Sequence, residues 1–469
     1  MELTASPLSY ELDLINQSNT WGFYYMYEAF FTTEQEDIDV LKVVSVDWIR
    51  DYRNAATDEI IATVAMPSGT YLKRILPFKE NLKLTMTKTP IGRTSADDPR
   101  EIMVQEFRCF IVNANDSKSI GTDPTTTNED ASNLVGMELI QVQLQELVWE
   151  QIRTEMVGGV PQHSTPFDLL IGLLWNSING LDADMANMIL GVNSVPPSNK
   201  TKRSQFLIPH GVPLTALAGL LQTQLGGIYN AGIGCYLQRG YWNVWPLYDY
   251  SRFDEVDFTA TFIILPDPRM KGTEKTYRVT ERQLVAVITG GVSKIDPSEG
   301  ELLNRGNAVR YNDPNAMMES FVEVKDNKAV AKRTYNNSEY VGVNRRDDST
   351  MSRVTTDMSK TNSYNEASKL AARNGAFFQL IWENSDPDYI VPDLQCEIGF
   401  TVNGEPVFIN GIVVHAHVLS ALAGTGLHQQ AHQIVTEVVV MVDRNSPEYQ
   451  QFVESQEQAE TASTEEPTE

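Results

Sequence analysis

The stretch of sequence that most constrains the fold lies near the end of the chain, at residues 392–442. It contains four runs with strand character, at 396–402, 407–409, 411–419 and 433–442. Asn403-Gly404 separates the first two runs and is a strong signal for a two-residue hairpin turn, because both residues tolerate a positive φ. The third run puts two sets of side chains on opposite faces of a strand: Ile412, Val414, Ala416 and Val418 on one, and Val413, His415, His417 and Leu419 on the other. The segment predicts a compact sheet that packs and assembles, since nothing in it resembles a nucleophile motif.

The charge balance restricts the partners that such a chain can bind. Its 469 residues include 62 acidic and 37 basic ones, which gives a formal net charge of -25. This charge opposes stable binding to nucleic acid, because such binding depends on Lys and Arg replacing the counterions of the phosphates. Hydrophobic residues make up 42% of the chain, which is ample for the cores of about two to four domains.

The sequence carries no signal for a membrane or for secretion. A membrane span needs an apolar run of about twenty residues, and none is present. The N-terminal residues MELTASPLSYELDL have neither the basic nor the apolar region of a signal peptide. Cys109, Cys235 and Cys396 lie far apart and form no CxxC pair, so we expect buried, reduced thiols in a chain that folds in a reducing compartment.

The N-terminal part predicts an antiparallel sheet or barrel. Strand-like runs lie at 41–49, 59–66, 81–89 and 107–113. In the third of these runs apolar and polar residues alternate, with Leu82, Leu84 and Met86 facing one way and Lys83, Thr85 and Thr87 the other. After a polar loop at 115–133, the apolar stripe of residues 137–157 predicts an amphipathic helix that ends at Gly158-Gly159.

The middle of the chain predicts helices and one hairpin. Thr165-Pro166 and Pro213 start two helices, and two β-rich runs surround Gln238-Arg239-Gly240. A strand follows at 256–265, and a helix is expected at 363–383. Residues 291–360 are polar and weakly patterned, and the acidic residues from 445 to 469 predict a disordered tail or an acidic docking peptide.

Histidine pairs and carboxylate pairs are the candidate chemical sites of the sequence. Metal-ligand spacing is present in His415-x-His417 and in His428-x-x-x-His432, but no third ligand motif accompanies them, so a hydrogen-bonded face or a subunit contact is the simpler interpretation. Glu146 and Glu150 are interpreted as the solvated face of the 137–157 helix. The acidic cluster of Glu383, Asp386, Asp388 and Asp393 is interpreted as turn chemistry at a helix-to-strand connection. No GxSxG, GxxxxGK[ST] or GxGxxG motif occurs, so the prediction is that the chain is not an enzyme and needs no cofactor.

Aromatic residues cluster at Trp21–Phe31 and at Tyr236–Tyr250. Stacking on nucleic acid normally accompanies a positive groove, which an acidic chain does not offer. Packing in a core or at an interface is the preferred interpretation, because aromatic side chains supply large buried area there.

Three stretches together resemble the tail or baseplate hub proteins of bacteriophages, which cap the tail tube above the spike. Residues 58–90, DEIIATVAMPSGTYLKRILPFKENLKLTMTKTP, are similar to the first tube-type β-barrel of such hubs. Residues 213–249, PLTALAGLLQTQLGGIYNAGIGCYLQRGYWNVWPLYD, are similar to their helical and hairpin middle. Residues 392–443 are similar to a second barrel that ends in a long strand.

The resemblance implies an α+β fold, mainly β, with two tail-tube-like antiparallel β-barrels and an inserted helical and β-hairpin middle domain. The implied domains are a first barrel at 1–135, a middle domain at 136–265, a second barrel at 266–290 and 363–444, a polar insertion at 291–362 and an acidic tail at 445–469.

The resemblance also implies a function. Family hubs are homotrimers in which two barrels per chain give a pseudo-six-fold ring. The ring contacts the tail tube protein, a spike or needle protein and other baseplate proteins, and DNA passes through its lumen in transit. The chain is then a virion protein without a membrane anchor, assembled in the host cytoplasm. We expect the run at 433–442 to carry ring closure, with interface residues Val438, Val440, Val442, Trp242 and Trp245.

Two alternatives stay open at the level of sequence. One is a metal-assisted hydrolase that uses His415, His417, His428 and His432. The other is a carbohydrate-binding tail module that uses the Trp and Tyr clusters, with Trp242 as the residue to test.

Overall fold

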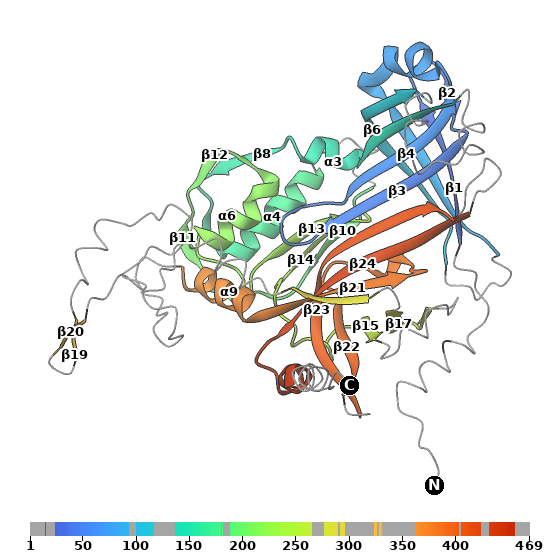
Figure 1. The fold of residues 1–469 in the computed structure, drawn as a ribbon. Coiled ribbons are helices and arrows are strands. Elements are labelled where there is room, and N and C mark those ends of the chain that lie inside the picture. The colour runs from blue at the N-terminus through green and yellow to red at the C-terminus, as the bar shows by residue number, and fades with distance from the viewer. Residues whose placement is uncertain are drawn as a thin grey trace, which may run out of the picture.

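The computed structural model arranges the chain as two β units and a smaller helical unit that contacts both (Figure 1). It describes residues 15, 24–92, 100–116, 137–179, 181, 188–264, 276–288, 291–295, 323–325, 328–330, 362–402, 405–423 and 431–454. The predicted class, α+β and mainly β with an inserted helical and hairpin unit, is confirmed. The predicted Asn403-Gly404 turn, most of the 291–362 insertion and the acidic tail from residue 455 on lie outside the described residues.

The first β unit is a closed antiparallel barrel of eight strands. Its pairings run β23-β3-β4-β7-β6-β5-β1-β24 and return from β24 to β23. Six of the strands are N-terminal, namely β1 (Tyr25–Thr32), β3 (Lys42–Asp51), β4 (Glu59–Pro67), β5 (Lys83–Pro90), β6 (Met103–Asp116) and β7 (Met137–Glu146). The other two are C-terminal, namely β23 (Glu405–Leu422) and β24 (Ala431–Asp443). The short strand β2 (Asp37–Asp39) pairs with β1, and the helical turns η1 (Tyr71–Ile75) and η2 (Leu76–Asn81) join β4 to β5.

Alternation of apolar and polar residues explains why these segments form a barrel. In β5, Leu84 and Met86 are fully buried while Lys83, Thr85 and Thr87 lie on the other face, as predicted. The inward side chains of the barrel strands form one core, which also includes Val418 of β23 and Ile434 of β24. The C-terminal strands are therefore part of the first barrel and do not merely border it.

The second β unit is an open, barrel-like sheet of eight strands around its own core. The order is β16-β17-β15-β22-β23-β24-β21-β18. The strands not yet introduced are β15 (Thr259–Ile264), β16 (Tyr277–Val279), β17 (Gln283–Ile288), β18 (Gly291–Ile295), β21 (Gly375–Glu383) and β22 (Gln395–Val402). Helix α9 (Ser363–Asn374) leads into β21, and the short helical turn η6 (Pro387–Tyr389) connects β21 to β22. No pairing between described residues joins β16 to β18, so this circuit stays open.

Strand β15 departs from the predicted antiparallel arrangement. It lies parallel to both of its neighbours, β17 and β22. Parallel neighbours need a crossover connection, and of the chain between β15 and β17 the structure describes residues 276–282, which include strand β16. Residues 260–263 of β15 are all buried, as expected for a strand that is covered on both faces.

The hairpin of β23 and β24 belongs to both β units. Its ladder extends from Gly411 opposite Val442 to Leu422 opposite His432. One end of the hairpin pairs with β3 and β1 of the first unit, and the other end pairs with β22 and β21 of the second. Burial in β24 changes accordingly, because residues alternate up to Glu437 whereas residues 438–442 are all buried. The predicted runs at 407–409 and 411–419 form one long strand for the same reason.

The helical unit packs its own core between two helices and a small sheet. Its elements are α3 (Leu147–Ile152), β8 (Met156–Gly159), β9 (Gln162–Ser164), α4 (Pro166–Asn179), β10 (Gly191–Ser194), β11 (Arg203–Gln205), β12 (Ile208–Pro213), α6 (Leu214–Thr223), β13 (Gly234–Gln238) and β14 (Tyr241–Trp245). The Thr165 hydroxyl accepts a hydrogen bond from the Asp168 N–H at 3.0 Å, which confirms the predicted N-cap. The hairpin of β13 and β14 turns at Arg239 and Gly240, both with positive φ.

Strands β19 (Glu323–Lys325) and β20 (Lys328–Val330) pair with each other.

Two predicted helices are wrong over part of their length. Residues 137–146 of the predicted 137–157 helix form strand β7, which is followed by the single helix α3. The helix predicted at 363–383 ends at Asn374, and Gly375 starts strand β21. In both segments neighbouring strands provide hydrogen-bond partners for the backbone. Strands β4 and β6 pair with β7, and β24 pairs with β21. These ladders override the helical spacing of the apolar residues.

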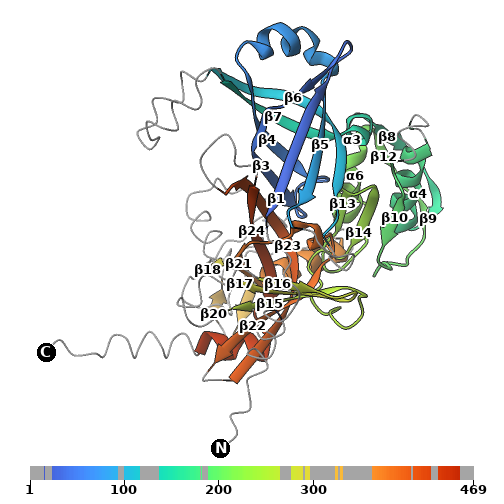
Figure 2. The same cartoon turned by 90° about the vertical axis from the view of Figure 1, so that its right-hand side faces the viewer.

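The predicted domain boundaries stay a prediction, although two strands pair across them. Strand β7 lies after the 135/136 boundary and pairs with β4 and β6. Strand β15 lies before the 265/266 boundary and pairs with β17 and β22. Figure 2 shows the first barrel above the second unit, with the helical unit at their side. Among the described helices, none has the length and apolar character needed to cross a bilayer.

We expect Ile434→Ala to weaken the fold by about 2–5 kcal/mol, because it opens a cavity in the first core on a strand that both units share. The matched control is Leu419→Ala on β23, where the side chain is 44% exposed and the expected loss is within about 0.5 kcal/mol. Urea unfolding followed by tryptophan fluorescence measures both. Equal effects of the two substitutions would contradict the assignment of Ile434 to the core.

Candidate functional site at the junction of the three units

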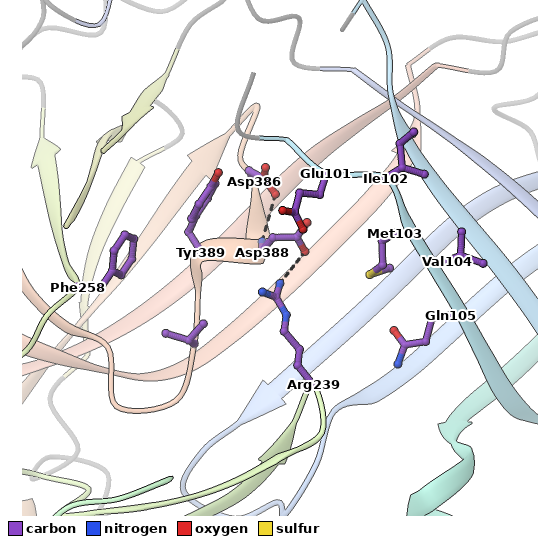
Figure 3. Close-up of a pocket in the computed structure, with 11 residues that line it drawn as sticks. Glu101, Ile102, Met103, Val104, Gln105, Arg239, Phe258, Asp386, Asp388 and Tyr389 are labelled. Atoms are coloured by element: carbon purple, nitrogen blue, oxygen red, sulfur yellow. Dashed lines mark hydrogen bonds and ion pairs between the residues drawn. The ribbon is translucent and has the colours of Figure 1, made fainter. Parts of the chain in front are cut away.

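Charged side chains gather at the end of the first barrel that faces the second unit. Figure 3 shows the η6 turn with Asp386 and Asp388, the side chain of Arg239 reaching it from the helical unit, and the first residues of β6 opposite. We name this group the charged junction. Its members are Arg50, Asp58, Lys88, Arg239, Asp386 and Asp388.

Lys88 is the centre of the charged junction. It lies near the end of β5 with its side chain fully buried. Its Nζ lies 2.9 Å from Asp388 Oδ2 and 3.4 Å from Asp386 Oδ1, and 4.3 Å from the centre of the Tyr25 ring. The lysine of the first barrel is thereby held by the turn of the second unit, with an aromatic face as an additional partner for its charge.

The η6 turn orients its own carboxylates. Asp386 caps the turn by accepting a hydrogen bond from the Asp388 N–H at 3.2 Å, which confirms turn chemistry for Asp386. The predicted helix-to-strand connection is wrong, because the turn joins strands β21 and β22. The Tyr25 hydroxyl donates to the other oxygen of Asp386 at 2.9 Å. Arg239 lies 3.0 Å from Asp388 and brings in the tip of the β13–β14 hairpin. Three units therefore meet on two neighbouring carboxylates.

Arg50 holds the same turn from a second direction. Its guanidinium donates to the carbonyl oxygens of Pro387 at 2.6 Å and of Ile390 at 3.0 Å, and it pairs with Asp58 at 3.2 Å. Asp58 in turn accepts a hydrogen bond from the Tyr236 hydroxyl at 2.9 Å. Arg50 on β3 thus contacts the second unit directly and is linked to the helical unit through Asp58.

The two carboxylates of the turn differ in pKa. Burial raises the pKa of Asp386, and although Lys88 lowers it, the pKa stays above its usual range. Burial acts on Asp388 in the same direction, but Lys88 and Arg239 outweigh it and lower the pKa of Asp388 to about 2. Carboxylates with divergent pKa values are also a pattern of acid–base catalysis. Here, however, the Asp386 side chain is 2% exposed and its oxygens contact Lys88 and Tyr25. The carboxylate therefore takes part in a contact between the units.

A further acidic group lies at the same end of the barrel. Glu146 ends β7, where it accepts a hydrogen bond from the Gln105 side chain at 3.3 Å. Burial, with Asp58 nearby, raises the pKa of Glu146 to about 7. The predicted solvated face of a helix is therefore wrong for Glu146, because the residue belongs to a strand that ends against the charged junction.

A pocket of about 790 Å³ opens beside the charged junction (Figure 3). Its walls come from all three units: Glu101, Ile102, Met103, Val104, Gln105, Arg239, Phe258, Asp386, Asp388, Tyr389 and Val391. The charged groups on its floor pair with one another, and the apolar side chains of Ile102 and Val104 are exposed at its rim. The pocket is therefore lined by paired charges and apolar side chains where the three units meet.

The structure separates the histidines proposed as metal ligands. His415 and His417 share the outward face of β23, as predicted, and His417 Nε2 lies 2.5 Å from Asp47 Oδ1 of β3. His432 is buried instead, where its Nε2 lies 3.0 Å from the Val43 carbonyl and its ring packs against Tyr27. His428 lies outside the described residues. Among the described residues, no group of three or more His, Cys, Asp or Glu side chains is placed to hold a metal ion.

The residues predicted for an interface lie inside this chain. Val438, Val440 and Val442 are fully buried in the core of the second unit, and Trp242 and Trp245 are 1% exposed. The physical reason is that β24 is covered on both faces over residues 438–442, while the two tryptophans face the cores beneath the β13–β14 hairpin. Their observed role is core packing, and a contact with another subunit through these side chains stays untested.

Sequence reasoning missed the charged junction, although one signal was present. Leu82, Leu84 and Met86 define the buried face of β5, and Lys88 is the next residue on that face. A lysine in phase with a buried stripe requires an opposite charge, because an unpaired buried cation is costly. The sequence does not reveal that the opposite charge is provided by Asp386, about 300 residues away, or that Arg50 and Arg239 approach the same turn.

Comparison with known proteins finds distant structural similarities at low sequence identity. No family model and no curated protein matches the sequence. The tail protein from Neisseria meningitidis MC58 aligns with a TM-score of 0.43 at 10% identity, covering 89% of this chain and 97% of that one. The 43 kDa tail protein of prophage MuSo2 from Shewanella oneidensis aligns with a TM-score of 0.41 at 10% identity, covering 88% and 96%.

A third similar structure comes from a secretion system. The E. coli c3393 protein is described as a component of the type VI secretion system with structural similarity to the T4 tail proteins gp27 and gp5. It aligns with a TM-score of 0.41 at 8% identity, covering 89% of this chain and 78% of that one. These proteins are of the class that the sequence resemblance indicates. With TM-scores below 0.5, the likeness assigns no activity or partner to this chain.

We expect Lys88→Met to lower the free energy of unfolding by about 3–5 kcal/mol, because it leaves the buried Asp386 without its cation. Lys83→Met is the matched control on the same strand, where a half-exposed ion pair with Glu106 contributes about 0–1 kcal/mol. Adding Asp386→Asn to Lys88→Met is expected to restore part of the loss. Equal effects of Lys88→Met and Lys83→Met in urea unfolding would contradict the central role of Lys88.

Stability is expected to fall as the pH rises from about 4.5 to about 7, by the contribution of Glu146. The folded chain keeps Glu146 protonated up to about pH 7, whereas the unfolded chain releases this proton near the ordinary value of 4.5. The folded state therefore binds more protons in this window, and the advantage is lost as the pH passes through 7. Glu146→Gln should remove this slope, so that its free energy of unfolding rises relative to the wild type with increasing pH. A constant difference between the two proteins from pH 4.5 to 8 would contradict the raised pKa.

Proposed function

We propose that the protein is a structural, non-enzymatic hub of a phage-type tail or baseplate. In this role three copies form a pseudo-six-fold ring that joins the tail tube to a spike or needle and contacts other baseplate proteins. The observation that carries the proposal is the β23–β24 hairpin, because it fixes two eight-stranded β units within one chain. Three chains then supply six β units for a ring.

The contacts between the units support the role of a rigid connector. Both β units share a backbone ladder, and the charged junction ties the second unit and the helical unit to the end of the first barrel. A connector between two other assemblies must keep its parts in fixed orientation. Buried, mutually paired charges favour one orientation, because any other leaves a desolvated charge without its partner.

The net charge supports passage of DNA through the ring. With a formal charge of -25, a lumen lined by this chain repels phosphate groups, so that a genome slides without binding. The location that follows is the virion, with assembly in the host cytoplasm.

The two alternative functions receive less support from the geometry. Trp242, the residue named for carbohydrate binding, is 1% exposed and offers no stacking face to a sugar. Of the four histidines named for a hydrolase, His432 is buried away from the pair on the outward face of β23.

We expect the purified chain to form a particle of three times its 52.6 kDa mass. Light scattering coupled to size exclusion at physiological salt measures the mass, and negative-stain images of the same fraction should show three-fold views with a central hole. A strict monomer over the whole concentration range would contradict the ring. A two-fold particle would contradict it equally.

A further inference from the structure

The helical unit contains a long stretch without acidic residues. From Met188 to Tyr248 there is no Asp or Glu, although the chain has 62 of them among its 469 residues. The basic residues of this stretch are Lys200, Lys202, Arg203 and Arg239. Arg239 belongs to the charged junction, which leaves three cations close together in the sequence without an acidic neighbour.

Arg203 starts strand β11, and Lys200 and Lys202 lie in the chain just before it. Strand β11 pairs with β9, and β12 pairs with β8, in two separate two-stranded sheets. We name residues 156–164 and 200–213 together the basic ribbon. Lys200, Lys202 and Arg203 are exposed, and no described residue forms an ion pair with them. Next to them Leu207 is 70% exposed, and Met156 and Val160 are also exposed. A basic surface of this kind attracts acidic segments, and the chain as a whole carries a net charge of -25.

The chain itself ends in a segment of matching charge. Residues 455–469 contain five Glu and neither Lys nor Arg. This segment lies outside the described residues and follows the last helical residue, Glu454. Its occurrence on the same chain gives it a high effective concentration at any surface within its reach.

Contacts in the structure set the distance that this segment must cover. The Arg444 N–H bonds to the Asn374 carbonyl at 3.1 Å, which places the end of β24 at the C-terminus of α9. The N-terminus of α9 touches the helical unit, where the Asn362 side chain donates to the Gln222 carbonyl at 2.6 Å. The Arg203 side chain lies against Gly226, a short distance along the chain from Gln222.

The tail is long enough for this path. Helix α9 has 12 residues and spans about 18 Å at 1.5 Å per residue. The C-terminal helix at 447–454 adds about 12 Å if it points away from the ribbon. Residues 455–469 in extended form reach about 50 Å at roughly 3.3 Å per residue. The length of the tail therefore exceeds the separation along this route.

We propose that residues 455–469 dock on the basic ribbon of their own chain. The carboxylates of the tail pair with Lys200, Lys202 and Arg203 and cover a stretch of the helical unit that would otherwise attract other acidic surfaces, including further copies of this chain. The proposal does not depend on the hub function, since it concerns one chain. A partner that binds the basic ribbon must then displace the tail.

Carbodiimide cross-linking of the full chain tests the contact, because this reagent joins a carboxylate to a lysine amine only when the two touch. Mass spectrometry is expected to find Lys200 or Lys202 joined to Glu residues between 457 and 469. The yield should fall several-fold at 1 M salt, where the screening length is about 3 Å. Lys73 and Lys79, exposed on η1 and η2, are the matched controls. Equal yields at the control lysines, or no product at Lys200 and Lys202, would overturn the proposal.

A co-expression experiment separates the same chain from a neighbouring copy. Full-length chains with Lys200→Ala and Lys202→Ala are produced together with chains that end at Glu454 but keep both lysines. Docking within one chain predicts that the product between Lys200 or Lys202 and the tail disappears. Its persistence would show that the tail reaches another copy and would overturn docking in the same chain.

Limited proteolysis provides a measurement without a reagent. Trypsin cleavage after Lys200, Lys202 and Arg203 should become several-fold faster at low salt in the chain that ends at Glu454. Cleavage after Lys73 and Lys79 should stay the same and so report an intact fold. An unchanged rate of trypsin cleavage at the basic ribbon would contradict the docking of the tail on it.

Discussion

The structure depends on the backbone ladder between β23 and β24. These two strands close the first barrel against β3 and β1, and their other ends form the centre of the second sheet between β22 and β21. Without this hairpin the first barrel has two open edges, and the second unit loses the strands that connect its halves. The β units are therefore neighbours that share their central element, and neither has a complete sheet of its own.

The charged junction adds orientation to this connection. A shared hairpin can still twist, but three side chains all reach the η6 turn: Lys88 from β5, Arg50 from β3 and Arg239 from the β13–β14 turn. Buried ion pairs contribute little net stability compared with apolar packing, yet each becomes costly when a partner is withdrawn. In the proposed hub, this property resists any relative motion of the three units while the ring holds two other assemblies together.

Much of the fold follows from local patterns in the sequence, and the charged junction does not. Alternation in residues 81–89 and 415–419, the Thr165 N-cap and the Arg239-Gly240 turn all depend on near neighbours and were predicted correctly, whereas residues 411–414 are all buried. The errors arose where distant strands decide the outcome: residues 137–146 and 375–383 have helical spacing of apolar groups but join existing ladders. The same holds for the site, because only Lys88 signals its burial by its position in β5, whereas its partners come from the far end of the chain. For Val438, Val440 and Val442, the unbroken apolar run marked a strand covered on both faces, which the interface interpretation overlooked.

Hydrogen exchange at equilibrium in moderate urea tests most directly whether the two β units form one cooperative structure. Amides of β4 and β7 belong to the first barrel alone, and amides of β15 and β17 belong to the second unit alone. If the shared hairpin couples the units, we expect both sets to open with one free energy and with the same dependence on urea. Two separate free energies that differ by more than about 1 kcal/mol, with separate urea dependences, would show that the units unfold independently and would contradict the coupling.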